Sequence, residues 1–164
     1  MVRAEQEWSS YRIPAAPAGP AFPDRQGLPL RIKSLSTFPS PPHAGRALDG
    51  DLRTRWSGGV QQQSAEATIE LESVGRVGQV VIELGGFATD FATRLRIDVS
   101  ADGRTWETAW IGDTALHAYY AAVRHPREVP LVFPLNRDGV RFIRLSQVGF
   151  GTHDWSIAEL HVLR

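Results

Sequence analysis

The chain has 164 residues and no cysteine, and its 18 basic residues balance 18 acidic ones, which gives a formal net charge of zero. This length is typical of one domain whose core is large enough to fold without disulfides. The balanced charge argues against nucleic acid as a partner, and the missing cysteines exclude thiolate metal sites. We find no apolar run long enough to span a bilayer and no signal peptide, so we expect no membrane insertion by this chain.

Proline and small residues dominate residues 1–29. Such a composition suits neither helix interiors nor central strands, so we predict a lead-in or linker there and a single domain over residues 30–164. Trp8, Tyr11 and Phe22 leave an alternative open. These aromatic residues could dock on the domain, because a disordered tail rarely contains large aromatic side chains.

Alternating or β-branched apolar residues predict a series of strands after residue 66. Turns rich in Gly, Asp and Asn separate them. The predicted strands are residues 67–72, 77–84, 94–100, 106–111, 130–135, 140–146 and 156–163. The alanine-rich residues 114–124 predict one short helix. This spacing favours an all-β fold, a jelly-roll β-sandwich with little helix.

Residues 46–56 read RALDGDLRTRW, in which two aspartates flank a glycine and a threonine follows. Ca²⁺ binds about 6–8 oxygen ligands, and carboxylates around a glycine bend can turn toward one ion. An isolated Asp-Gly-Asp is also common as a turn with solvated carboxylates. The pattern alone therefore leaves calcium binding and an ordinary turn both open.

Three motifs occur in order along the chain. They are A-x-D-G-D-x-x-T-x-W at residues 47–56, S-x-D-G-x-x-W at residues 100–106 and W-S-I-x-E-L at residues 155–160. Together they resemble the discoidin, or coagulation-factor type C, domains with a galactose-binding-like fold, which include family 32 carbohydrate-binding modules. The resemblance covers about residues 30–164.

This resemblance implies a structural Ca²⁺ site that joins the first motif to the last strand. The implied ligands are the carbonyl of Arg46, the side chains of Asp49 and Asp51, the hydroxyl and carbonyl of Thr54, the carbonyl of Ala158 and the carboxylate of Glu159. The ion would clamp two distant parts of the chain and so stabilise the folded state.

A second resemblance involves the later part of the chain. The stretches AYYAAVRHPREVPLVFPL, RFIRLSQ and DWSIAEL are similar to extracytoplasmic discoidin-type domains of bacterial membrane glycosyltransferases. This similarity implies an accessory domain of a larger protein, located in the periplasm or at the cell surface. The rest of a membrane glycosyltransferase would then be a partner.

Sugar binding requires aromatic faces for the apolar side of a pyranose and planar polar groups for its hydroxyls. Loops at one end of a sandwich can hold both. The candidate contacts are Gln62 in the run Gln61–Gln63 of the predicted loop 57–64, Phe87, Asp90, Phe91, Arg124 with its neighbour His125, Phe150, His153 and Asp154. Each also has a structural interpretation, such as Phe91 or Phe150 capping the core. We assign the tryptophans of the three motifs, Trp56, Trp106 and Trp155, mainly to packing. For Trp155, a position that also lines the ligand site stays open.

The histidines lack zinc-site spacing, and the chain contains neither a nucleophile elbow nor a phosphate loop. The sequence therefore predicts a non-catalytic carbohydrate-binding module with a structural calcium site, whose partner is a glycan or glycoconjugate. A protein- or phospholipid-interaction module of the same fold remains the alternative.

Overall fold

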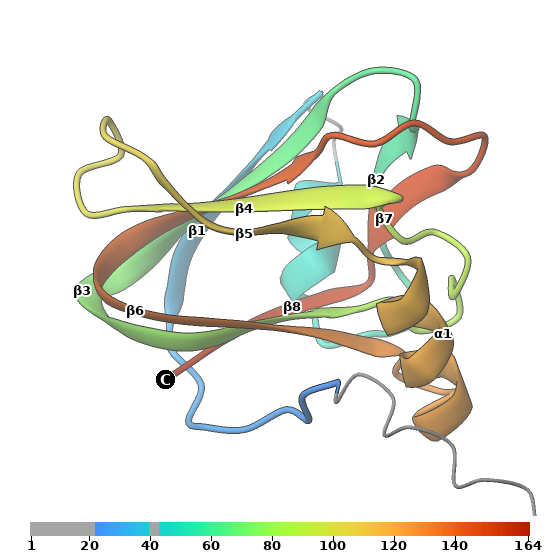
Figure 1. The fold of residues 1–164 in the computed structure, drawn as a ribbon, viewed down its shortest axis with the longest axis horizontal. Helices are drawn as coiled ribbons and strands as arrows, with labels where there is room; N and C mark the ends of the chain where they lie inside the picture. Colours follow the sequence, from blue (N-terminus) through green and yellow to red (C-terminus); the bar gives the residue numbers. More distant parts are fainter. Residues whose placement is uncertain (1–21, 40–42) are drawn as a thin grey trace, which may run out of the picture.

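The chain folds into a β-sandwich with one helix at its side (Figure 1). The structure, a computed structural model, describes residues 22–39 and 43–164. In chain order its elements are β1 (Ile32–Phe38), the 3₁₀ helix η1 (Ala44–Leu48), β2 (Trp56–Val60), β3 (Ala65–Glu83), β4 (Arg94–Ser100), β5 (Glu107–Asp113), α1 (Ala115–Arg124), β6 (Pro130–Gln147), β7 (Asp154–Ile157) and β8 (Glu159–Leu163).

Two long strands, β3 and β6, run through both layers of the sandwich. They pair antiparallel with each other, and their register shifts between Glu70 and Gln79. On one side of these shifts β1 pairs with β3, and β4 lies between β6 and β5; on the other side β8 pairs with β3. The layers meet where both long strands bend, at the left of Figure 1. A separate two-stranded sheet of β2 and β7 lies at the opposite end.

The core lies between the layers. Trp56 of β2 and Trp155 of β7 are fully buried there and pack edge to face, with 5.0 Å between ring centroids. The assignment of these two tryptophans to packing is therefore confirmed, and Trp155 does not line a surface site. Trp106 differs, because it is partly exposed and the guanidinium carbon of Arg144 lies over its ring, 4.3 Å from the ring centroid.

Helix α1 is fixed at its start by Thr114, which is fully buried. The Thr114 hydroxyl donates a hydrogen bond to the carbonyl of Ala92, and its N–H donates to the carbonyl of Thr93 at 3.3 Å. Small side chains, Ala118 and Ala121, face inward and let the helix approach β6. The helix thereby holds the segment between β3 and β4 in place.

The predicted strands are confirmed with two kinds of difference. Strand β3 is continuous and includes both predicted strands 67–72 and 77–84, and β6 likewise includes 130–135 and 140–146. The predicted strand 156–163, in contrast, is divided into β7 and β8 at Ala158. The helix is confirmed one residue shorter. Strands β1 and β2 were not predicted, so the supposed loop 57–64 begins as a strand. Within β2, Gly58 and Gly59 weakened the alternation that signals a strand.

Residues 22–29 of the predicted lead-in pack on the domain. Leu28 and Arg164 exchange two main-chain hydrogen bonds, and Pro29 forms a bridge with Leu163. The ring of Phe22 lies 4.5 Å from that of Tyr120 on α1. The docking considered for Phe22 is therefore observed, whereas Trp8 and Tyr11 lie outside the described residues.

Candidate functional site

The loop between η1 and β2 gathers oxygen atoms around Asp49. One carboxylate oxygen of Asp49 accepts a hydrogen bond from the Thr54 hydroxyl at 2.7 Å, and the other accepts from the N–H of Asp51 at 2.9 Å. Gly50, with φ of +77°, allows the sharp bend between the two aspartates. Its N–H donates to the carboxylate of Glu159, the first residue of β8.

Glu159 is the buried member of this group, with 6% of its surface exposed. Burial raises the pKa of Glu159, and the neighbouring Asp49 carboxylate raises it further. The hydrogen bond from Thr54 lowers the pKa of Asp49. Two adjacent carboxylates, one of them buried, repel each other unless a proton or a cation lies between them.

The side chain of Asp51, which the resemblance implies as a ligand, contacts Arg53 in this structure. Its carboxylate makes a double contact with Arg53, at 2.9 Å from both Nε and Nη2. That contact lowers the pKa of Asp51 to about 2. Its main-chain carbonyl, in contrast, lies 3.2 Å from the Thr54 hydroxyl, so Asp51 faces the group with its backbone.

The remaining implied ligands are close in the fold. Arg46 lies in η1, which packs against β8, and Ala158 immediately precedes Glu159. Among the described residues, no three His, Asp or Glu side chains are placed to hold a metal together. A cation here would therefore rely on two carboxylates, the Thr54 hydroxyl and main-chain carbonyls, a donor set of hard oxygens that fits Ca²⁺.

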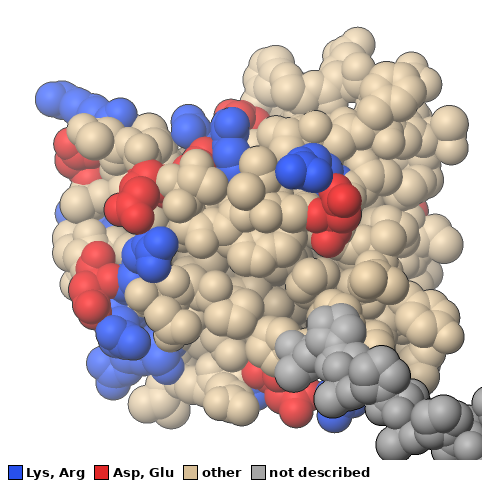
Figure 2. Space-filling view, in the orientation of Figure 1, with Lys and Arg blue, Asp and Glu red and all other residues tan. Residues whose placement is uncertain are grey.

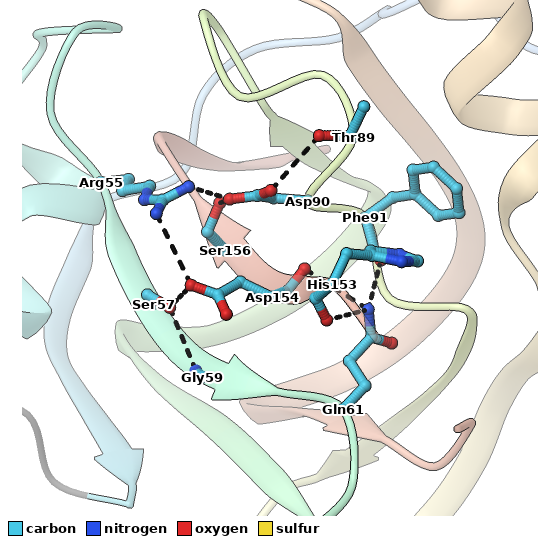
Figure 3. Close-up of polar contacts among 10 residues, drawn as sticks. All are labelled: Arg55, Ser57, Gly59, Gln61, Thr89, Asp90, Phe91, His153, Asp154 and Ser156. Carbon is cyan, nitrogen blue, oxygen red and sulfur yellow. Dashed lines mark hydrogen bonds and ion pairs between the residues drawn. The ribbon is translucent and has the colours of Figure 1, made fainter. Parts of the chain in front are cut away.

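A second group of polar side chains lies at the β2–β7 end of the sandwich (Figure 3). Arg55, just before β2, forms an ion pair with Asp90, and its other terminal nitrogen lies 3.6 Å from Asp154. Asp90 is 8% exposed and also accepts a hydrogen bond from Ser156 at 3.1 Å. Asp154 is more open and accepts from Ser57 at 3.1 Å.

Gln61 joins the three loops of this end. Only 1% of its surface is exposed. Its amide nitrogen donates to the carbonyls of Phe91 at 2.9 Å and His153 at 3.3 Å, while its amide oxygen accepts from the N–H of Thr93 at 2.7 Å. The hydrogen bonds of this buried amide therefore link the loops to one another, and such links hold the surface groups of the loops in position.

His153 and Phe91 lie beside each other, with 5.1 Å between ring centroids. The Nε2 atom of His153 is 3.3 Å from the carbonyl of Phe91, which leaves the Nδ1 atom for another partner. Phe91 packs partly against the core, whereas Phe150 is 74% exposed. Phe150 is therefore the ring that this end presents to solvent.

The other predicted contacts are distributed unevenly. Phe87 lies under Arg55, 4.3 Å from its guanidinium carbon, and Gln62 is exposed beside Gln61. Arg124 is not part of this end: it pairs with Asp24 at 3.2 Å and lines a pocket of about 400 Å³ between α1 and the lead-in.

Arg55 and Ser57 were missed by the sequence analysis. An arginine between Thr54 and the motif Trp56 gives little signal, because its carboxylate partners, Asp90 and Asp154, come from loops distant in sequence. Gln61 could not be told from its neighbours in a run of identical residues.

Charges on the face seen in Figure 2 occur as opposite-sign neighbours without a large patch of one sign. The upper right, where the β2–β7 end lies, shows no Lys, Arg, Asp or Glu on this face. Within the described residues, no helix is long and apolar enough to cross a membrane.

The fold and these sites define a β-sandwich of the discoidin kind. Residues 31–160 match the family model of the F5/8 type C domain, and the chain therefore belongs to that family. The resemblance of the three motifs is thus confirmed. Among proteins of curated function, none matches the sequence significantly.

Several solved structures share the fold. The CBM32 module CpGH89CBM32-5 from Clostridium perfringens, in complex with GalNAc-β-1,3-galactose, has a TM-score of 0.64 at 18% identity and covers 80% of this chain and 94% of its own. The CBM32 of AlyQ, in complex with 4,5-unsaturated mannuronic acid, has a TM-score of 0.61 at 17% identity, with coverages of 84% and 98%. The C-terminal domain of a chitobiase from Bacteroides fragilis has a TM-score of 0.58 at 23% identity, with coverages of 80% and 91%. At these identities the likeness establishes the β-sandwich fold.

Proposed function

We propose that this chain is a non-catalytic carbohydrate-binding module that binds a neutral glycan at the β2–β7 end of the sandwich. One observation carries the proposal: the loops of this end carry an exposed ring, Phe150, together with partly exposed planar groups, those of Arg55 and Asp154. A ring covers the apolar face of a pyranose, and planar polar groups bind neighbouring hydroxyls. The loops are held rigidly by Gln61, which lowers the entropy cost of binding.

The charges at this end favour neutral sugars over acidic ones. Both terminal nitrogens of Arg55 face carboxylates, one from Asp90 and one from Asp154. One cation is thus opposed by two anions, which leaves an excess of negative charge. A sugar carboxylate would be repelled there, whereas hydroxyl groups can donate to Asp154 and accept from Arg55.

Relatives of the same fold support sugar binding as a class without fixing the sugar. One is in complex with GalNAc-β-1,3-galactose and another with 4,5-unsaturated mannuronic acid, so neutral and acidic sugars both occur. The loops of each module must therefore decide its ligand. In this chain the preference for neutral sugars depends on Arg55 and its two partners, Asp90 and Asp154.

The proposal includes a structural calcium ion held by Asp49, Thr54 and Glu159 together with main-chain carbonyls. The buried carboxylate of Glu159 beside Asp49 is the observation that supports it, because a cation between the two would relieve their repulsion. Arg53, four residues after Asp49, is engaged by Asp51. The ion would stabilise the join between η1 and β8 and would supply no chemistry at the sugar site.

We further propose that the module is an accessory domain of a larger extracytoplasmic or membrane-attached glycosyltransferase. The similarity of residues 119–160 to bacterial domains of that kind supports this context. The glycan bound at the loops would then be a substrate, product or neighbouring glycoconjugate of the attached enzyme.

The alternative is a module that binds phospholipid surfaces, and one observation favours it. Val60 and Val148 are exposed in segments at the same end as Phe150, so this end carries three exposed apolar side chains. Such projecting side chains can enter the interfacial layer of a membrane.

A glycan array distinguishes the two functions. The purified chain is applied in calcium and in calcium-free buffer, and in parallel is mixed with vesicles of phosphatidylcholine alone or with phosphatidylserine. Specific capture of neutral glycans without vesicle binding supports the proposal. Vesicle binding without glycan capture would establish the lipid function instead.

A further inference from the structure

Helix α1 has an unusual distribution of apolar side chains. Its inward side consists of small residues, with Ala118 and Ala121 buried, and of His117, which packs on Trp110 and Phe133. Its large apolar residues point outward: Leu116 is 62%, Tyr119 67% and Val123 66% exposed. Tyr120, at 39% exposed, lies at the edge of this group. We call Leu116, Tyr119, Tyr120 and Val123 the outer face of α1.

Residues three, four and seven positions apart form one stripe on a helix, so the outer face is continuous. A surface helix normally turns such a stripe toward the core. Here the stripe faces away from the core, and contiguous exposed apolar surface usually marks a contact with another polypeptide segment.

The described chain begins at the border of this surface. The ring of Phe22 packs 4.5 Å from Tyr120 and 4.9 Å from His117. Two ion pairs hold the next residues beside the helix, Asp24 with Arg124 at 3.2 Å and Arg25 with Glu83 at 2.7 Å. The segment that precedes Phe22 therefore starts next to Tyr120, at the edge of the outer face.

That segment has the composition and the length to cover the outer face. It contains Trp8, Tyr11 and Ile13. The ten residues of α1 span about 15 Å, and a proline-rich chain extends about 3.1 Å per residue. The residues between Ile13 and Phe22 are thus enough to pass along the whole helix.

We propose that residues 8–21 of this same chain dock on the outer face of α1, with Trp8, Tyr11 and Ile13 packing on Leu116, Tyr119 and Val123. The lead-in would then be a fixed part of the domain rather than a free linker. This contact lies on α1, apart from the loops assigned to the glycan, and does not depend on them.

The absence of cysteine in the chain gives a clean test. Ser10→Cys, placed between Trp8 and Tyr11, carries a nitroxide spin label, and amide signals of the isotope-labelled full chain are recorded. Docking predicts loss of the signals of residues 115–124, and their return when the outer face is made polar by Tyr119→Ser with Val123→Ser. Both substitutions replace exposed side chains, so the fold should persist.

A label at Ser73→Cys is the matched control, because Ser73 lies in the part of β3 where its register with β6 shifts. Figure 1 shows that β3 and β6 bend at the end of the sandwich opposite α1. Unchanged α1 signals with the label at position 10 would overturn the proposal. It would also be overturned if a spin-labelled copy without isotope removes the α1 signals of a separate isotope-labelled copy. That outcome would assign the outer face to a second copy of the chain.

Discussion

The N–H of Gly50 donates a hydrogen bond to the carboxylate of Glu159, a residue 109 positions later in the chain. This contact joins the loop after η1 to the start of β8. It places the Asp49 and Glu159 carboxylates next to each other, and it links two segments whose association requires closing a long loop. A cation at this point would stabilise the fold by binding only the native state.

Asp49→Ala should remove the stabilisation by calcium. Where free calcium is 100-fold above its Kd, the ion contributes about 2.7 kcal/mol, which corresponds to a fall in Tm of roughly 5–10 °C for a chain of this size. Thermal melts in calcium and in calcium-free buffer measure the effect. Asp138→Ala, which removes an exposed carboxylate paired with Arg76, is the control and should leave the response to calcium intact. A normal response to calcium in Asp49→Ala would refute the site.

The calcium effect should also depend on pH. Because burial raises the pKa of Glu159 above its usual 4.5, the metal-free folded chain keeps a proton that the unfolded chain has lost. In calcium-free buffer this carboxyl thus stabilises the fold below pH 4.5, and the contribution is lost as pH rises through the raised pKa. Asp49, whose pKa is lowered from 3.8, adds no change in this window.

Calcium binds only the deprotonated carboxylates. The difference in Tm between calcium and calcium-free buffer should therefore widen as the pH rises from 4.5 to neutral. Melting curves across this range test it. A difference that is constant with pH would mean that Glu159 is not a ligand.

The sequence predicts that these two segments approach each other because short motifs encode the approach. Asp49 and Thr54 lie in one motif and Glu159 in another, and the fold brings the motifs together through the contact of Trp56 with Trp155. The role of the Asp51 carboxylate was harder to predict. Whether it faces an ion or Arg53 depends on side-chain orientation, and an aspartate two residues before an arginine gives no such information.

Gln61→Ala should destabilise the domain, whereas Gln62→Ala should not. Loss of the buried Gln61 amide leaves the N–H of Thr93 without its partner and removes one of the two side-chain nitrogens that face the carbonyl of Phe91, which costs about 1–3 kcal/mol. The exposed Gln62 should change stability by less than about 0.5 kcal/mol. Urea unfolding of the two variants provides the comparison. Equal stability would contradict the role of Gln61 as the residue that fixes the loops.

Phe150→Ala and Phe91→Ala should separate binding from folding. Phe150 is exposed, so its loss should weaken glycan capture and leave Tm near that of the unchanged chain. Phe91 packs partly on the core, so its loss should cost roughly 2–3 kcal/mol, somewhat less than a fully buried phenylalanine. Glycan titration and thermal melts of both variants measure this. Unimpaired capture by Phe150→Ala would remove this ring from the site.

The sequence was less informative about the loop end, for a physical reason. The sequence predicts loops at one end of the sandwich as a candidate ligand site, and it groups Phe150, His153 and Asp154 by their closeness in sequence. Arg55 covers Asp90, and three loops bury Gln61. Both arrangements depend on contacts between segments that are distant in sequence. Such contacts carry no local pattern, and the strand β2 that positions Arg55 is obscured by its glycines.

The most direct test of the proposed sugar site is to map a bound glycan on the folded chain. A neutral oligosaccharide selected on the array is titrated into the isotope-labelled full chain in calcium, and amide shifts are followed residue by residue. A glycan site at the β2–β7 end predicts saturable shifts concentrated in residues 55–62, 87–93 and 148–155, and their loss in Asp154→Ala. Shifts that concentrate elsewhere, or none with any array ligand, would contradict a glycan site at the β2–β7 end.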